Sequence, residues 1–347
     1  MTLLVISRNE TGEATSLKKF PGVRLVEALS AFGAFTLVDV PSYLNTWSPR
    51  GIARILHRYL SAVVTIVRYR DEEVFFYNLP KAYLPLYAAH VLTRFARPGL
   101  FLADGVNCTK MEHNELAFLA LFNRLISLPM NDVLRAIARD LRRVIWFPGF
   151  AGVTPVSPRR ARSKAGSATL MYNSSLVPHN EPESLITLVE QRPWLSVVVT
   201  DTEESYRRYL LTINSDPTRP LPERLRFAGP LNLTNYRNLA CSVDGVLLCR
   251  DEAQFANRYN FPSKLIEAIQ LGVPIICTHP IGAIRSELYC MLGGGESNSA
   301  LWEYLEQYHT GAFGDAEREF LALCDAQRLM EWLQDGPHEM VRGADAR

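Results

Sequence analysis

The sequence predicts an α/β protein made of two Rossmann-like halves, and three observations lead to this prediction. The chain has 347 residues, whereas a single core rarely grows past ~250–300 residues. Apolar runs of strand length alternate with amphipathic stretches, which is typical of a parallel sheet covered by helices on both faces. Charge also divides the chain, since residues 1–165 carry 22 Lys and Arg against 12 Asp and Glu, and residues 166–347 carry 15 against 24.

A first Rossmann-like domain is expected over residues 1–153. Its apolar, β-branched and aromatic runs predict strands at 2–8, 35–40, 62–68, 74–77, 100–103, 124–128 and 143–147. The stretches between them predict helices at 24–31, 50–60, 83–96, 112–122 and 131–140. The helix at 50–60 is basic and amphipathic.

Residues 154–167 are rich in Pro, Arg, Ser and Gly, and are expected to link the domains. A second domain is expected over 168–335, and residues 336–347 are expected to form a flexible tail. Its predicted elements are strands at 168–172 and 195–200, helices at 181–191 and 203–212, further strands near 226–228, 244–248 and 273–278, and a helix opening at Pro262. Helices at 299–309, 315–324 and 326–334 are expected to pack back across the domains.

Composition excludes several classes of protein. No apolar run approaches the ~20 residues that a membrane span needs, and the N-terminal apolar run lacks the basic leader of a signal peptide. Six cysteines form no CxxC pair and have no histidine at metal spacing, so we expect reduced thiols, no metal and a cytoplasmic location. A net charge of +1 does not favour a nucleic-acid partner.

The most informative stretch is 260–278, which predicts an anion site at the start of a helix. Pro262 suits the first helical position, so the N–H groups of Ser263 and Lys264 would point out of the helix end, where the dipole favours an anion. Lys264 adds a positive charge there. Glu267 lies one turn further on the same face, and its carboxylate can accept hydrogen bonds from two hydroxyls. A phosphate site beside such a carboxylate suits a nucleoside diphosphate.

The run from Phe261 to Ala268, followed by the run from Leu271 to Ile276, resembles the donor-binding helix and next strand of retaining, family-4-type glycosyltransferases of the GT-B fold. The turn at Gly229, Pro230 and Leu231 resembles the segment of that family that approaches the nucleotide base. Residues 166–280 fit the pattern well, and the first half fits loosely. The resemblance implies two Rossmann-like domains facing across a cleft and metal-independent, retaining transfer from a UDP- or GDP-sugar. It also implies a glycan or lipid-linked acceptor, as in polysaccharide synthesis.

One departure concerns the loop after the first strand of the second domain, where the family usually places an Arg and a Lys. Residues 172–180 contain neither. Arg250 and Arg258 are the cations that can join Lys264 around the diphosphate, and Asn173 and Ser174 can donate neutral hydrogen bonds. The first glutamate of the family's usual pair is also missing, because that position is Tyr259.

In the first half, Asp104 is a candidate to orient or deprotonate the acceptor hydroxyl, or simply to cap a turn. The basic character of this half suits peripheral contact with an anionic membrane at its inner face, or a solvated surface. Two other functions stay open: a degenerate module that binds a sugar nucleotide without turnover, and a sugar-nucleotide epimerase or hydrolase on the same fold.

Overall fold

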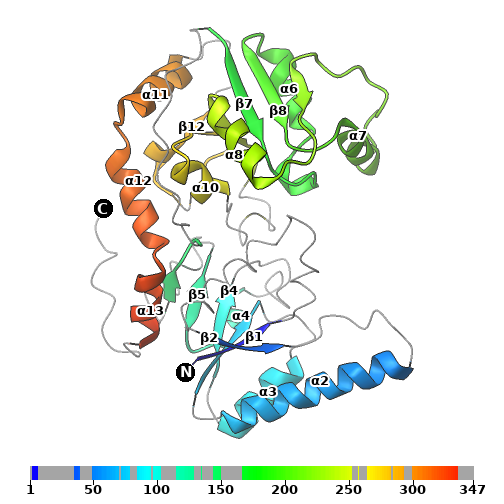
Figure 1. Ribbon diagram of the computed structural model, residues 1–347, viewed down its shortest axis with the longest axis vertical. Helices are drawn as coiled ribbons and strands as arrows, with labels where there is room; N and C mark the ends of the chain where they lie inside the picture. Colours follow the sequence, from blue (N-terminus) through cyan, green and yellow to red (C-terminus); the bar gives the residue numbers. More distant parts are fainter. Residues whose placement is uncertain are drawn as a thin grey trace. The chain divides into compact units, whose positions relative to one another are not determined.

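The chain forms two compact units, each built on its own sheet (Figure 1). The first consists mainly of Met1–Phe150 and Leu323–Arg347, and the second of Ala151–Asn257 and Pro262–Ala322. The computed structural model describes residues 2–6, 35–39, 49–69, 72–78, 84–94, 97–102, 115–128, 134, 144–149, 166–251, 257, 264–282, 284–292 and 299–334.

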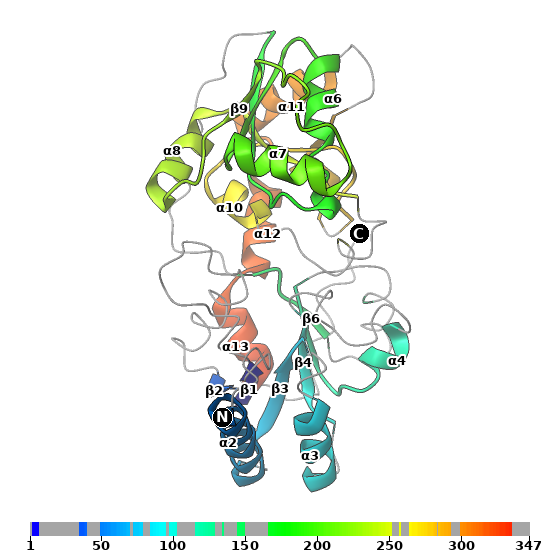
Figure 2. The same cartoon turned by 90° about the vertical axis from the view of Figure 1, so that its right-hand side faces the viewer.

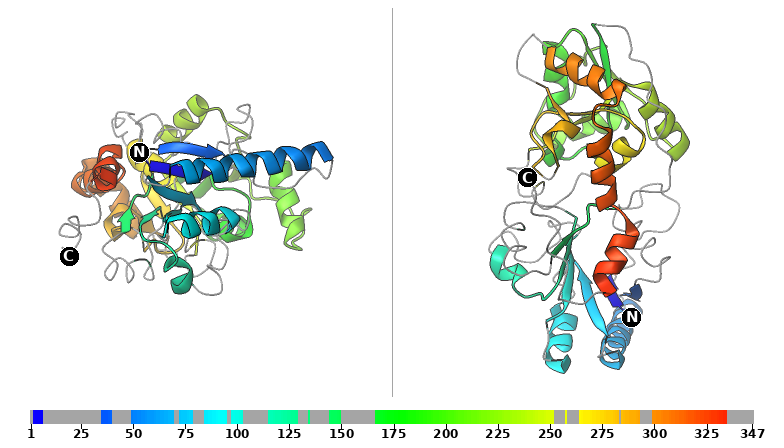
Figure 3. Two further views of the ribbon diagram at one scale, coloured as in Figure 1. Left: turned by 90° about the horizontal axis from the view of Figure 1, so that it is seen from below. Right: turned by 90° about the vertical axis from the view of Figure 1, so that its left-hand side faces the viewer.

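The first unit contains a six-stranded parallel sheet in the order β2-β1-β3-β4-β5-β6. Its strands are β1 (Thr2–Ile6), β2 (Phe35–Asp39), β3 (Glu73–Tyr77), β4 (Gly99–Leu102), β5 (Leu125–Ser127) and β6 (Val144–Trp146). Every residue of β4 and β5 is buried, as expected for parallel strands covered on both faces. Helices α2 (Pro49–Arg68) and α3 (Leu84–Arg94) pack against each other, and α4 (Glu115–Leu119) is a short helix of this unit (Figures 2 and 3).

The strand expected at 62–68 is wrong, because these residues form the last third of α2. The prediction followed the β-branched residues of the run, which favour strands. However, nothing interrupts the helix that begins at Pro49, because α2 contains no proline or glycine after Gly51. Burial also has a helical period: Ala62 and Ile66 are buried, whereas Val64 and Val67 are exposed.

The second unit contains a six-stranded parallel sheet in the order β12-β11-β10-β7-β8-β9. Its strands are β7 (Ala168–Tyr172), β8 (Leu195–Val199), β9 (Leu225–Phe227), β10 (Gly245–Leu248), β11 (Ile275–Cys277) and β12 (Cys290–Met291). The first five were predicted, and the two-residue β12 was not. The helices are α6 (Ser184–Gln191), α7 (Glu203–Thr212), α8 (Leu233–Ser242), α10 (Lys264–Gln270), α11 (Ser299–Thr310) and α12 (Gly314–Leu323).

Local sequence explains where two helices of this unit begin. The Thr202 hydroxyl accepts a hydrogen bond from the Ser205 amide at 3.1 Å and caps α7. The Asn232 side chain accepts one from the Asn235 amide at 2.8 Å and caps α8. Helix α7 then contributes Tyr206, Tyr209 and Leu210 to a core that it shares with the sheet and α6.

The C-terminal helix α13 (Ala326–Gln334) packs on the first unit (Figure 1). The Arg124 guanidinium lies 3.8 Å from the centre of the Trp332 ring and donates to the Trp332 carbonyl at 2.6 Å. Arg328 donates to the Trp146 carbonyl at 3.0 Å. The expectation that the chain returns to the N-terminal domain is therefore confirmed for α13.

Several expectations fall outside the described residues: the helices at 24–31 and 131–140 (apart from Leu134), the linker at 154–167 up to residue 165, and the tail at 336–347. Among the residues that are described, no helix has the length and apolar character to cross a membrane.

Candidate functional site

The strand order of the second unit marks where a ligand would bind. From β7 the chain moves outward through β8 and β9, and it then returns to the other side of β7 as β10, β11 and β12. Ligands of such sheets bind outside the carboxyl ends of the strands at this reversal. Asn173 directly follows β7, and Arg250 is two residues past β10, so both lie at the reversal.

Helix α10 presents Lys264 and Glu267 together on its outer face. Its other face is fixed by the buried residues Leu265, Ile266, Ala268 and Ile269. The Lys264 ammonium lies 3.6 Å from a Glu267 carboxylate oxygen, and the two side chains are 42% and 23% exposed. Neither group is packed in the core, and the predicted sharing of one face is confirmed.

Tyr236 on α8 joins this pair to the loop after β7. Its hydroxyl accepts a hydrogen bond from the Asn173 amide at 2.6 Å and donates one to the Glu267 carboxylate. The Lys264 ammonium lies 5.2 Å from the centre of the Tyr236 ring. Burial, and then the charge of Glu267, raise the pKa of Tyr236, so the phenol stays protonated and donates to the carboxylate.

Asn173 retains an unused acceptor at this site. The residue is buried, and its side-chain oxygen has no hydrogen-bond partner among the residues that the structure describes. A buried amide oxygen without a partner costs about 1–3 kcal/mol, so a ligand donor placed there would bind favourably. Lys264, Glu267, Tyr236 and Asn173 together form what we call the α10 site: a cation, a carboxylate, a phenol and an amide.

The loop after β7 is held by its own hydrogen bonds. Tyr172 donates to the Asn180 carbonyl at 3.0 Å, and the Asn180 side chain donates to the Ser175 carbonyl at 3.0 Å. The Asn257 amide donates to the His179 carbonyl at 2.7 Å and to the Asp251 carbonyl at 2.8 Å. Contacts of Asn257 therefore connect the loop after β7 with the segment after β10.

Arg250 is buried and donates to the Asn257 carbonyl at 2.8 Å. The structure thus gives it a part in holding these loops, and its predicted contact with a diphosphate stays a prediction. Ser174 is half-buried beside Asn173. Of the other predicted site residues, Pro262, Ser263, Arg258 and Asp104 lie outside the described residues.

The predicted base-approaching turn follows β9, the outermost strand of the sheet. Gly229 has φ 70°, a conformation that favours glycine, and its amide donates to the Asp201 carbonyl at 3.0 Å. Pro230 is exposed and Leu231 is half-buried. The turn therefore lies at the carboxyl edge of the sheet, and its contact with a base stays a prediction.

A second polar pair lies at the same edge and was not predicted. His279 is two residues past β11, and its Nε2 lies 3.0 Å from a Glu181 carboxylate oxygen at the end of the loop after β7. Glu181 has φ 47°, in the left-handed region. A histidine just past a strand is a signal that could have been followed, since the carboxyl edge is where such sheets bind ligands.

Cys249 and the described His, Cys, Asp and Glu side chains bear on thiol and metal chemistry. Cys249 is buried, and burial raises the pKa of its thiol to about 12, so it stays uncharged near neutral pH. Within the described ranges, no group of three or more His, Cys, Asp or Glu side chains could hold a metal ion.

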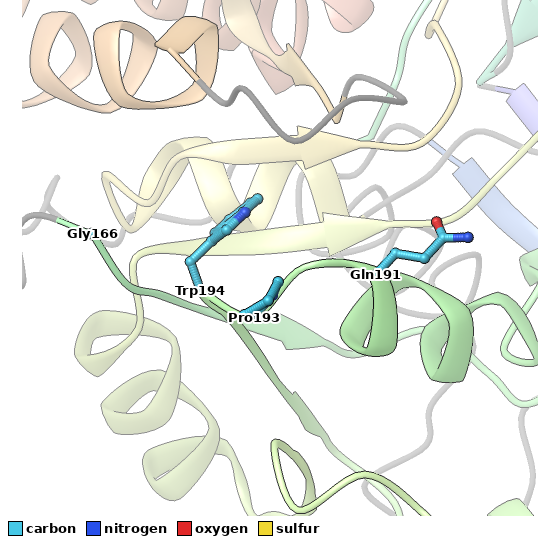
Figure 4. Close-up of a pocket in the computed structure, with 4 residues that line it drawn as sticks. All are labelled: Gly166, Gln191, Pro193 and Trp194. Atoms are coloured by element: carbon cyan, nitrogen blue, oxygen red, sulfur yellow. The ribbon is translucent and has the colours of Figure 1, made fainter.

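A pocket in this unit lies apart from the α10 site. It is lined by Gly166, Gln191, Pro193 and Trp194 (Figure 4). Gly166 precedes β7, and Pro193 and Trp194 precede β8, so the pocket is at the amino edge of the sheet. Ligands of parallel sheets bind at the opposite edge, and we assign no function to this pocket.

Comparison with known proteins identifies the architecture. No protein-family model matches the chain, and no curated protein matches it. Among solved structures, sucrose-phosphate synthase from Thermosynechococcus elongatus matches with a TM-score of 0.57 and 14% identity, covering 95% of this chain and 96% of that one. The lipopolysaccharide outer core galactosyltransferase WaaB matches with a TM-score of 0.52 and 10% identity, covering 96% of this chain and 98% of that one. HepE from Anabaena in complex with UDP matches with a TM-score of 0.51 and 13% identity, covering 95% of each chain.

The chain has the GT-B fold. Each match covers nearly the whole of both chains, so the likeness includes both parallel-sheet units. The expected fold class is confirmed. At 10–14% sequence identity, these matches show a shared fold alone.

Proposed function

We propose that the chain is a glycosyltransferase whose second unit binds a nucleoside-diphosphate sugar at the α10 site. The observation that carries this proposal is the convergence of Lys264, Glu267, Tyr236 and Asn173 from three separate segments beside the reversal of the strand order. The fold supports it, since HepE was solved with UDP and the T4 phage protein BGT, with a TM-score of 0.50, was solved with UDP-glucose.

Each group of the α10 site has a part in this proposal. The Glu267 carboxylate accepts hydrogen bonds from the ribose hydroxyls, and Tyr236 holds it in place by donating to it. Lys264 faces the diphosphate and stabilises the charge that develops as the sugar–phosphate bond breaks. The free oxygen of Asn173 accepts a hydrogen bond from the nucleotide.

The reaction we propose forms a bond between the anomeric carbon and an acceptor hydroxyl oxygen, while the nucleoside diphosphate leaves. The acceptor, a glycan or lipid-linked sugar, loses its proton to a base, for which Asp104 is the candidate. Arg250 and Arg258 are proposed to add positive charge around the diphosphate. Metal independence and retention of configuration belong to this proposal and rest on the sequence resemblance.

Two observations favour other functions. The loop after β7 has no Lys or Arg, which favours a module that binds a sugar nucleotide without turnover. The Glu181–His279 pair could act as acid and base, which favours a sugar-nucleotide hydrolase or epimerase. We rank both below the transferase, because the α10 site provides both a carboxylate for the ribose and a cation for the departing diphosphate.

A nucleotide panel followed by a turnover assay tests the proposal. We expect UDP or GDP to raise the thermal unfolding midpoint more than ADP or TDP, because a ligand at 100 times its Kd stabilises the native state by ~2.7 kcal/mol. The matching sugar nucleotide should then release its diphosphate when acceptor is supplied. Binding without release, with acceptors of both classes present, would identify a binding module. If the diphosphate is released in water and no acceptor increases its release, the protein is a hydrolase. If no nucleotide raises the unfolding midpoint, the assignment of nucleotide binding to the α10 site is contradicted.

A further inference from the structure

We propose that the outer face of α2 in the first unit binds an anionic membrane surface. Four apolar side chains form what we call the α2 stripe: Leu56, Leu60, Val64 and Val67. Their spacings of four, four and three residues place them on one side of the helix. They are 57%, 66%, 63% and 40% exposed, so the protein leaves this stripe uncovered.

The opposite side of α2 is already used for packing. Ala62 is 2% exposed and Ile66 is 1% exposed. The helix packs against β2 and α3 and reaches beyond the strands of the sheet (Figures 1 and 3). The stripe is therefore a second apolar face, additional to the one that holds the helix to its unit, and a lone exposed leucine would need no such explanation.

Basic side chains lie beside the stripe. By helical position, His57 and Arg68 lie along one flank of it. His57 and Arg68 are exposed. The 20 residues of α2 include four arginines and no Asp or Glu.

These features select a lipid surface as the occupant. A helix with an apolar face, a basic flank and no acidic residue lies in the interface of an anionic bilayer. There the apolar side chains enter the acyl boundary, and nearby arginines are attracted to the anionic headgroups. A second copy of α2 would bring like charges together with no acidic partner on either helix. The stripe, about 16 Å long at 1.5 Å per residue, lies along a surface and does not cross it.

Flotation with vesicles tests this inference separately from donor binding. The full chain should float with vesicles of phosphatidylcholine and phosphatidylglycerol, and stay in the soluble fraction with phosphatidylcholine alone. Flotation should weaken as salt rises, since exposed charges are screened. The double variant L56Q/L60Q keeps the charge and the helix propensity, and should lower the partition coefficient about tenfold or more.

Leu211→Gln provides the matched control. Leu211 is 58% exposed on α7 of the second unit, so its loss should leave flotation unchanged. Circular dichroism should show equal helix content in all variants. Three results would overturn the inference: no flotation of the unaltered chain with anionic vesicles, an equal loss for Leu211→Gln, or a dimer in sedimentation analysis that L56Q/L60Q dissociates while vesicle binding stays the same.

Discussion

Tyr236 is the residue that connects the parts of the α10 site. It is the only one of the four that contacts each of the other three: its hydroxyl bonds to Asn173 and Glu267, and its ring lies under Lys264. Sequence patterns predicted the spacing of Lys264 and Glu267, because three residues along a helix share a face. They could not predict the hydroxyl contacts, because the bond between Asn173 and Tyr236 joins positions 63 residues apart. The same holds for Glu181 and His279, which are 98 residues apart.

Tyr236→Phe should weaken nucleotide binding by about 0.5–1.5 kcal/mol, the net value of one hydrogen bond. The substitution leaves the Asn173 amide without its acceptor and the Glu267 carboxylate without its donor, so the carboxylate is no longer held toward the ribose. Calorimetric titration with the nucleotide that binds best would measure the change.

Tyr304→Phe is the control for that experiment. Tyr304 is a buried tyrosine of the same unit whose hydroxyl donates to the Leu288 carbonyl at 3.1 Å. Its loss should lower stability to a similar degree and leave the nucleotide affinity unchanged. Equal losses of affinity in both variants would assign the effect of Tyr236 to general stability.

At the scale of elements, the sequence predicts best where one signal dominates. Continuous apolar runs located β7, β8 and β10, and the glycine after α10 located its end: Gly272 has φ 63°, and its amide donates to the Ile269 carbonyl at 3.0 Å. The run at 62–68 was misread because its β-branched residues continue a helix already begun. The two residues of β12 are too few to form a pattern.

The docking of α13 could not be read from the sequence either. Arg124 precedes β5 and is separated from Trp332 by 208 positions. In the structure it is buried, pairs with Glu73 on β3 at 2.7 Å, and stacks on Trp332. One side chain therefore joins two strands and the C-terminal helix of the first unit.

Arg124→Met should destabilise the first unit by about 3–5 kcal/mol, because Glu73 loses the partner that compensates its partly buried charge. Hydrogen exchange followed by mass spectrometry would show faster exchange in β3, β5 and α13. Arg219→Met is the matched control, since Arg219 pairs with Glu190 at 2.6 Å on the surface. An exposed pair contributes ~0–1 kcal/mol, so exchange should change little. Equal effects of the two substitutions would contradict the role of Arg124.

At the scale of the whole molecule, the prediction of two parallel-sheet units is confirmed, and the matches to GT-B structures cover nearly the full chain at 10–14% identity. Such a fold needs only the period and order of its apolar segments, which many sequences can provide. The function needs particular side chains at the carboxyl edge of one sheet. That is why the fold was predictable, whereas the substrate must be established by experiment.

Calorimetric titration of the full chain and of Glu267→Ala with UDP and GDP tests the central claim most directly. We expect the better nucleotide to bind the unaltered chain and to lose about 1–3 kcal/mol of binding free energy in Glu267→Ala, the scale for hydrogen bonds to a charged group. Glu306→Ala, which removes an exposed carboxylate from α11 of the same unit, should bind as the unaltered chain does. Equal affinity in all three proteins would contradict a nucleotide site at Glu267.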